Sequence, residues 1–183
     1  MAAPLRTVVT GGPGTGKSTL IDALAARGPA TEPEVARAIL REPGGMALRR
    51  DDPQGFARAM FDAELAAYRR AEEGGSPIVY DRGFPDIVGF LRLEGLPVPA
   101  PIDEACRNLR YDGPVFRAPP WRAIYRRDDE RIQDWDDARA SDAAVCAAWR
   151  DYGYAPIDLP RAGVADRVAF VLAHMDAAAG EGD

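Results

Sequence analysis

Residues 11–18 read GGPGTGKS and fit the pattern G-x-x-x-x-G-K-[ST] of a phosphate-binding loop. Glycines let successive backbone N–H groups curve around a phosphate, because larger side chains would block its approach. The Lys17 ammonium is expected to reach the β- and γ-phosphates, and the Ser18 hydroxyl to hold Mg²⁺. The residues expected to bind a nucleoside triphosphate are Gly12, Pro13, Gly14, Thr15, Gly16, Lys17, Ser18 and Thr19.

Lys17 is also the only lysine of the chain, because 22 of the 23 basic residues are arginines. Lysine and arginine replace one another readily on an exposed surface. A phosphate loop, by contrast, needs a compact charge on a slim stem, and the broad planar fork of arginine is a poor substitute there. The composition therefore marks Lys17 as a position where only lysine serves, which makes it the first candidate for a catalytic residue.

The composition also excludes several classes of protein. A net charge of −6 argues against a nucleic-acid partner. No apolar run reaches the roughly 18 residues of a membrane span, and the first residues do not resemble a secretory leader. Two cysteines, Cys106 and Cys146, suit a reducing compartment, so a cytoplasmic location is expected. The single histidine, His174, leaves little for histidine-based catalysis or a zinc site.

A second candidate for chemistry is the Asp81-Arg82 pair, which follows the apolar run 78–80. A carboxylate at a strand end can face a Mg²⁺–phosphate cluster or accept a proton from an attacking hydroxyl, so Asp81 is a candidate metal ligand and catalytic residue. Arg82 could hold a transferring or acceptor phosphate. The alternative for Asp81 is that it only caps the helix that follows.

Glu34 and Arg37 lie where a second strand is expected to end. The two side chains could grip a polar acceptor such as a sugar hydroxyl, and they are the candidate substrate-binding residues together with Arg82. Alternatively, the carboxylate of Glu34 could simply complement the N-terminus of a helix that begins near Val35.

The segment 121–131 carries arginines at helical spacing, namely Arg122, Arg126, Arg127 and Arg131. A basic lid over about 117–135 would exclude water and neutralise charge in the transition state, with Arg127 and Arg131 as catalytic groups. The alternative is a surface helix in which the neighbouring acidic residues pair with these arginines.

Short apolar runs alternate with helical patterns along the whole chain, which predicts one α/β domain over residues 1–183. Strands are expected at 5–10, 78–80, 113–116 and 155–159. Helices are expected at 18–27, 53–73, 87–93, 141–152 and 164–178, with Asp86 capping the third. This alternation implies a parallel sheet covered on both faces. Ligands bind at the carboxyl ends of such strands, which is where the candidate residues lie.

Four blocks, TVVTGGPGTGKSTL, TEPEVAR, PIVYDRGFPDIVGFL with the following LEGLPVP, and PPW…YRRDDER, carry a resemblance to a known family. The chain resembles small P-loop proteins labelled AAA family ATPase, which are related to nicotinamide-riboside-kinase-type and nucleoside-kinase-like domains. The resemblance implies a kinase-type P-loop NTPase fold, with a five-stranded parallel sheet, helices on both faces and an Arg-bearing lid. It also implies that Asp81 is a metal-proximal acid or base, that Glu34 and Arg82 contact an acceptor, and that Arg127 and Arg131 belong to the lid.

Two functions follow from these residues. The first is a Mg²⁺-dependent kinase that transfers the γ-phosphoryl group of ATP or GTP to a small hydroxyl-bearing acceptor such as a nucleoside or nucleotide. The alternative is a nucleotide-dependent regulatory switch, or a slow NTPase, that binds a protein or lipid partner. A kinase needs a pocket beside the γ-phosphate on which Asp81 and Glu34 converge, whereas a switch does not.

Overall fold

The computed structural model describes residues 5–72, 76–124 and 134–180, and a five-stranded sheet lies at its centre. The strands are β1 (Arg6–Thr10), β2 (Ala30–Glu32), β3 (Ile78–Asp81), β4 (Val115–Arg117) and β5 (Ile157–Asp158). They lie in the order β2-β3-β1-β4-β5, and every neighbouring pair is parallel. Every residue of β1 and β3 is buried, as expected for strands covered on both faces.

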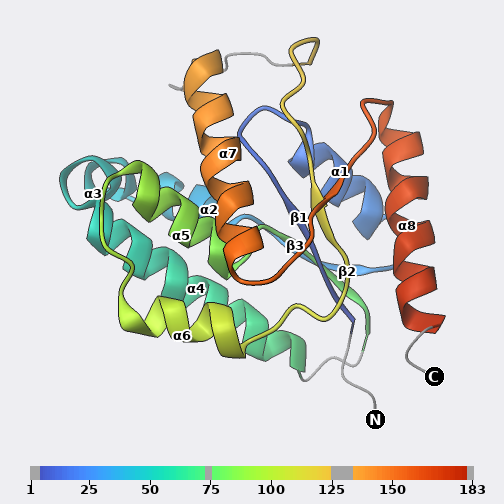
Figure 1. Cartoon of the computed structure of the whole chain (residues 1–183), viewed down its shortest axis with the longest axis horizontal. Coiled ribbons are helices and arrows are strands. Elements are labelled where there is room, and N and C mark those ends of the chain that lie inside the picture. Colours follow the sequence, from blue (N-terminus) through green and yellow to red (C-terminus); the bar gives the residue numbers. More distant parts are fainter. Residues whose placement is uncertain (1–4, 73–75, 125–133, 181–183) are drawn as a thin grey trace.

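Helices cover both faces of this sheet (Figure 1). The helices α1 (Lys17–Ala25) and α8 (Val164–Gly180) lie on one face. On the other lie α4 (Pro53–Glu72), α5 (Phe84–Leu93), α6 (Ala100–Asn108) and α7 (Trp135–Asp151), and the short helices α2 (Val35–Arg41) and α3 (Gly45–Asp51) pack against α4. Each face buries its own apolar cluster, so the predicted five-stranded α/β fold is confirmed.

Most helix predictions hold to within a few residues, but two helices begin earlier than expected. Helix α5 begins at Phe84 rather than 87, because Gly83 is its N-cap and Asp86 is its third residue rather than its cap. Helix α7 begins at Trp135 rather than 141. Its N-cap is Asp134, whose carboxylate accepts hydrogen bonds of 2.9 Å from the backbone N–H groups of Asp136 and Asp137.

The structure also locates the two cysteines. Cys106 in α6 and Cys146 in α7 are both free and buried. Among the helices of the described residues, none combines the length and the apolar character that a membrane crossing requires.

Candidate nucleotide and acceptor site

The phosphate loop joins β1 to α1 at the carboxyl edge of the sheet. Gly14 and Gly16 have φ angles of 72° and 80°, in the left-handed region that glycine adopts without strain. An internal hydrogen bond stabilises the loop, because the Thr15 hydroxyl donates to the carbonyl of Gly12 at 3.0 Å. Helix α1 begins at Lys17, so its first N–H groups and the positive end of its dipole face the loop. The predicted motif therefore has the strand–loop–helix context that phosphate binding requires.

Lys17 is buried at the centre of this loop. Its Nζ donates to the carbonyls of Gly12 at 2.6 Å and Gly11 at 3.1 Å. Burial, assisted by the positive charge of Arg82, lowers the pKa of Lys17 to about 8, while the nearby carboxylates raise it. A cation with so little hydration interacts more strongly with a phosphate than a solvated one does, because less water must be displaced.

Asp81 is the last residue of β3, and the charges of Asp81 and Lys17 interact. Its side chain is 4% exposed, and Oδ1 has no hydrogen-bond partner within the described ranges. Burial raises the pKa of Asp81 to about 6, and the positive charge of Lys17 opposes the shift. The capping alternative is wrong for this residue, because the carboxylate that bonds the N–H of Gly83 at the start of α5 belongs to Asp86.

Glu34 is held by Arg82 across the carboxyl ends of β2 and β3. The Arg82 Nε donates to Glu34 Oε1 at 2.8 Å, and Arg37 lies 3.8 Å from the other oxygen. Burial alone would raise the pKa of Glu34, but the positive charges of Arg82 and Lys17 outweigh the effect of burial and lower the pKa to about 2. Glu34 is also the N-cap residue of α2, which begins at Val35, so its charge lies at the positive end of that helix as the alternative expected, although its side chain makes no capping hydrogen bond.

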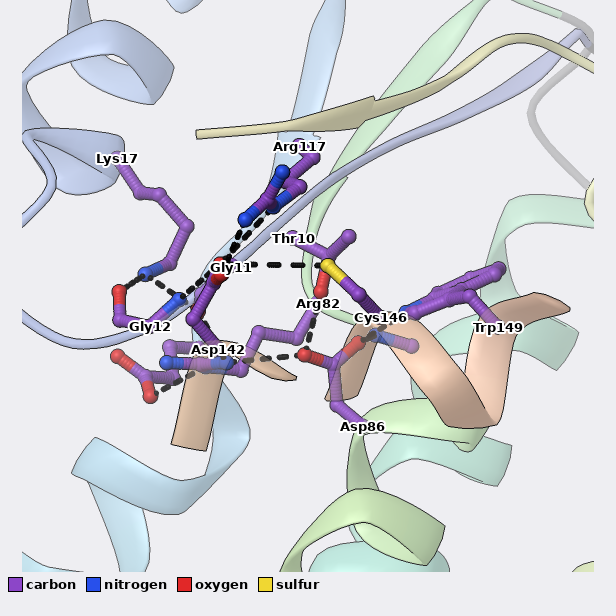
Figure 2. A network of polar contacts seen from close by, with 12 residues as sticks. Thr10, Gly11, Gly12, Lys17, Arg82, Asp86, Arg117, Asp142, Cys146 and Trp149 are labelled. Carbon is purple, nitrogen blue, oxygen red and sulfur yellow. Dashed lines mark hydrogen bonds and ion pairs between the residues drawn. The ribbon is translucent and has the colours of Figure 1, made fainter. Parts of the chain in front are cut away.

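Arg82 is the centre of a buried network that sequence reasoning did not anticipate. Its Nη1 donates to the carbonyl of Gly11 and to Asp86 Oδ1, both at 2.9 Å. Asp86 in turn accepts from the Thr10 hydroxyl at 2.7 Å and from Trp149 Nε1 at 2.9 Å, as Figure 2 shows. The guanidinium thus ties the phosphate loop to the start of α2, to α5 and, through Asp86 and Trp149, to α7. Its predicted contact with a phosphate stays a prediction.

The same network explains the glycine that follows Arg82 in the sequence. A Cβ atom at Gly83 would come within 2.8 Å of the Tyr111 ring, so no larger residue fits there. Arg82 itself adopts a φ of 79°, a left-handed conformation that costs a non-glycine residue on the order of 1 kcal/mol. Its bonds to Glu34, Asp86 and Gly11 offset that strain.

Helix α7 holds the phosphate loop from the other side. The buried carboxylate of Asp142 accepts from the N–H of Gly12 at 3.4 Å and forms an ion pair with Arg117 at the end of β4 (Figure 2). A Cβ atom at Gly12 would approach the carbonyl of Ala138 to 2.6 Å, so α7 packs directly on the loop. No local pattern predicts this contact, because Asp142 lies 130 residues from Gly12.

A cavity of about 520 Å³ opens above the loop and has two chemically different ends. The phosphate end is lined by residues 13–19 with Glu34, Arg37 and Arg82. The other end, which we call the acceptor end, is formed by helices α2 to α5. Its lining residues include the largely apolar set Val35, Leu40, Met46, Phe56, Met60, Glu64, Ile87 and Phe90. Charged residues of α2, α3, α5 and the C-cap of α5 also line the cavity, namely Arg41, Arg49, Asp86 and Glu94. Asp81 does not line the cavity, so of the two carboxylates expected to converge there, only Glu34 faces it.

The lid prediction falls mainly on residues outside the described ranges. Arg126, Arg127 and Arg131 all belong to 125–133. Of the segment's arginines, Arg122 is described, and its guanidinium lies 5.1 Å from the centre of the Trp135 ring. Arg117, at the start of the expected lid, pairs with Asp142 and Asp158 instead of facing the cavity.

The donor set suits Mg²⁺ better than a metal that binds in an all-protein cage. Among the described residues no group of three or more acidic, histidine or cysteine side chains could hold a metal. Mg²⁺ usually takes one or two protein oxygens and completes its shell with phosphates and water. The Ser18 hydroxyl at the cavity wall is an oxygen of this kind. Asp81 Oδ1 is a second oxygen, unpaired among the described residues, but it is buried outside the cavity lining, so its role as a metal ligand stays a prediction.

Comparison with known proteins supports the same fold. A family model described as "AAA domain" matches residues 6–167. No curated protein gave a significant match. Among solved structures, the chain is similar to deoxyadenosine kinase from M. mycoides with the products dCMP and a flexible dCDP bound. The TM-score is 0.70 and the identity 14%, and 94% of this chain and 99% of that chain are covered. The dATP complex of the same kinase gives a TM-score of 0.68 at 13% identity, over 93% of this chain and 99% of that one.

Proposed function

The chain belongs to the AAA domain family, and from this premise we propose that it is a Mg²⁺-dependent kinase. It would transfer the γ-phosphoryl group of ATP or GTP to a small hydroxyl-bearing acceptor, with nucleosides and nucleotides as the first candidates. The likeness to a deoxyadenosine kinase with nucleotides bound supports this choice of acceptor class.

The observation that carries the proposal is the shape of the cavity. A switch or a slow NTPase needs room for a nucleotide and a water molecule. Here the space that begins at Lys17 and Ser18 continues past Glu34 to Phe56 and Phe90. Its volume of about 520 Å³ lies within the usual range for small-molecule sites. An acceptor bound at the far end would present its hydroxyl to the phosphate end.

The residues take distinct roles in this proposal. Lys17 and the loop N–H groups bind and orient the phosphates, and Ser18 and Asp81 hold Mg²⁺. Bound Mg²⁺ supplies charge neutralisation on the phosphates. Glu34 stays ionised and lines the cavity, so it would accept a hydrogen bond from the acceptor hydroxyl and orient it, while Asp81 acts beside the metal.

Three expectations from the sequence remain proposals beside this one. Arg37 and Arg82 would contact the acceptor or its phosphate from the cavity wall. Arg127 and Arg131 would close over the phosphates as lid groups and neutralise charge in the transition state. The cytoplasmic location expected from the cysteines is likewise still a prediction.

The experiment that tests the function follows the γ-phosphate. The protein is incubated with γ-labelled ATP or GTP, Mg²⁺ and a pool of small metabolites that includes nucleosides and nucleotides. The kinase proposal expects label in a small-molecule product, and no transfer by Lys17→Ala. Label that appears only as inorganic phosphate would contradict a kinase and favour an NTPase or a switch.

A further inference from the structure

Glu64 lies at the acceptor end of the cavity, among apolar side chains. It follows Phe56 and Met60 on α4 at intervals of four residues, so the three share one face of the helix. All three line the cavity, as does Phe90 of α5, whose ring contacts that of Phe56. Glu64 is 3% exposed, so its carboxyl group is a buried polar group beside the apolar side chains of Phe56 and Met60. Such a group is costly to bury unless it is hydrogen-bonded or meets a ligand.

The hydrogen bonds around Glu64 determine where its proton can lie. The backbone N–H of Phe84 donates to the Tyr111 hydroxyl at 3.2 Å, and that hydroxyl donates to Glu64 Oε1 at 2.8 Å. A phenol has a single proton, so Oε1 of Glu64 must be an acceptor. Within the described ranges, Oε2 has no hydrogen-bond partner and is the oxygen left for a proton.

The charges that face Glu64 favour the protonated form. Asp86 on α5, Glu32 on β2 and Asp81 on β3 are all acidic, and the Tyr80 hydroxyl of β3 is also close. Across the described part of the chain, no lysine or arginine forms an ion pair with Glu64. Burial, reinforced by these carboxylates against the hydrogen bond from Tyr111, raises the pKa of Glu64 to about 8.

We propose that Glu64 is a specificity-determining residue that acts as a neutral carboxylic acid and donates its O–H to a planar heterocycle of the acceptor. This inference rests on the kinase function proposed above, because it names the acceptor class. The heterocycle packs against Phe56 and Phe90, whose rings meet edge to face with centroids 5.5 Å apart. A ring nitrogen or carbonyl oxygen of the heterocycle accepts a hydrogen bond from the Glu64 O–H group.

The wall favours such a ring over a simple sugar or polyol. Phe56, Met60, Ile87 and Phe90 offer no hydrogen bond, so they would leave the hydroxyl groups of a sugar unpaired. A flat aromatic ring buries its faces against these side chains and needs only one or two polar contacts at its edge. Glu64 shares the face of α4 with Phe56 and Met60, so it is placed to supply such a contact to a ring that packs on them.

Calorimetry on the full chain tests this inference without any need for catalysis. The probes are adenosine and cytidine, whose bases do not titrate between pH 7 and 9, with ribose as the probe that lacks a base. We expect the two nucleosides to bind and ribose not to bind. Glu64→Gln keeps a neutral donor and should bind them within about threefold of the wild type. Glu64→Leu removes the donor and should bind them about tenfold more weakly.

The pH dependence separates a neutral donor from an ionised carboxylate. If the protonated form binds, wild-type affinity falls about tenfold from pH 7 to pH 9, as a group with a pKa of about 8 loses its proton. Glu64→Gln should show no such fall. The exposed Asp62, also on α4, provides a matched control as Asp62→Asn, which should behave as the wild type.

Several outcomes would overturn the inference while leaving the kinase proposal open. These are no binding of either nucleoside, affinity for ribose equal to theirs, or Glu64→Leu with unchanged affinity and only a lower melting temperature. Conversely, nucleoside binding with the expected variant and pH pattern, but without phosphoryl transfer, would support Glu64 and count against the kinase.

Discussion

The two ends of the cavity are built in different ways. The phosphate end consists of a short loop whose geometry is fixed by glycines, with a buried ammonium and a network that centres on Arg82. The acceptor end consists of side chains from four helices, in which an apolar group around Phe56, Met60 and Phe90 lies beside Glu64, a buried acid, and other charged residues also line the cavity. The first recognises a chemical group common to all nucleotides, while the second can differ in shape and polarity between proteins of one fold. In the proposed function, the loop would bind the phosphates, and the helices would select the acceptor.

Lys17→Ala tests the phosphate end and should have the largest effect. Removal of the one ammonium in the loop is expected to reduce phosphoryl transfer or nucleotide turnover by about 10³-fold. Because the lysine charge is buried at a cost, the melting temperature should not fall. The check is a turnover assay with a melting curve for each variant, and Lys17→Arg serves as a charge-preserving comparison. Unchanged nucleotide affinity and turnover would remove the basis for the phosphate-loop assignment.

Arg82→Met tests the network that joins the two ends. The substitution leaves the buried carboxylates of Glu34 and Asp86 without their cation, so the free energy of unfolding should fall by about 3 kcal/mol. Denaturant unfolding measures this. The exposed pair of Arg107 and Asp103 gives the matched control, and Arg107→Met should leave the free energy of unfolding nearly unchanged. Equal losses in the two variants would mean that the network contributes no more than a surface pair.

Asp81→Asn tests the proposed Mg²⁺ ligand. The neutral amide keeps the shape of the side chain but loses the charge that a hard cation prefers, so transfer should fall about 10²-fold. The concentration of Mg²⁺ needed for half-maximal activity should rise as well. An activity assay over a Mg²⁺ series provides both values. Intact transfer at an unchanged Mg²⁺ requirement would contradict the role given to Asp81.

The smallest effect is a pH dependence at the same residue. The pKa of Asp81 is raised to about 6, so the carboxylate is lost as the pH falls, and at pH 5 about one tenth of it remains ionised. Transfer should therefore drop between pH 7 and pH 5 when Mg²⁺ is limiting, and saturating Mg²⁺, which favours the ionised carboxylate, should shift this drop to lower pH. Glu34 has a pKa of about 2, so it stays ionised between pH 5 and pH 7 and contributes nothing to this change in activity. The profile of Asp81→Asn should lack this step, and an identical step in both proteins would assign it to another group.

The difference between the two ends also explains what the sequence could predict. The phosphate loop, the strand before it and the carboxylates at the strand ends follow from local patterns, because parallel strands bring their carboxyl ends to one edge. The partners of those residues do not. Asp142 lies 130 residues from Gly12, Trp149 lies 63 from Asp86, and Tyr111 lies 47 from Glu64. Only the packed tertiary structure brings such pairs together.

The starts of two helices were not predicted, for different local reasons. Asp134 and Asp137 form a capping box at the start of α7, a local signal that the expected start at residue 141 did not use. Helix α3 has Gly44 as its N-cap and no capping side chain, so little in the sequence marks its beginning. It contributes Met46 to the acceptor end, a part of the site that the sequence did not reveal.

Met46 offers the most direct test of the claim that one cavity serves both substrates. Its side chain is 49% exposed and lines the acceptor end, so Met46→Asp should leave the fold intact while placing a charge on an apolar wall. The measurement is the steady-state KM of both substrates, with the acceptor found by the labelled-phosphate assay. We expect the KM of the acceptor to rise about tenfold and that of ATP or GTP to stay unchanged. An unchanged acceptor KM, or a rise in the nucleotide KM alone, would contradict an acceptor site between α2 and α5.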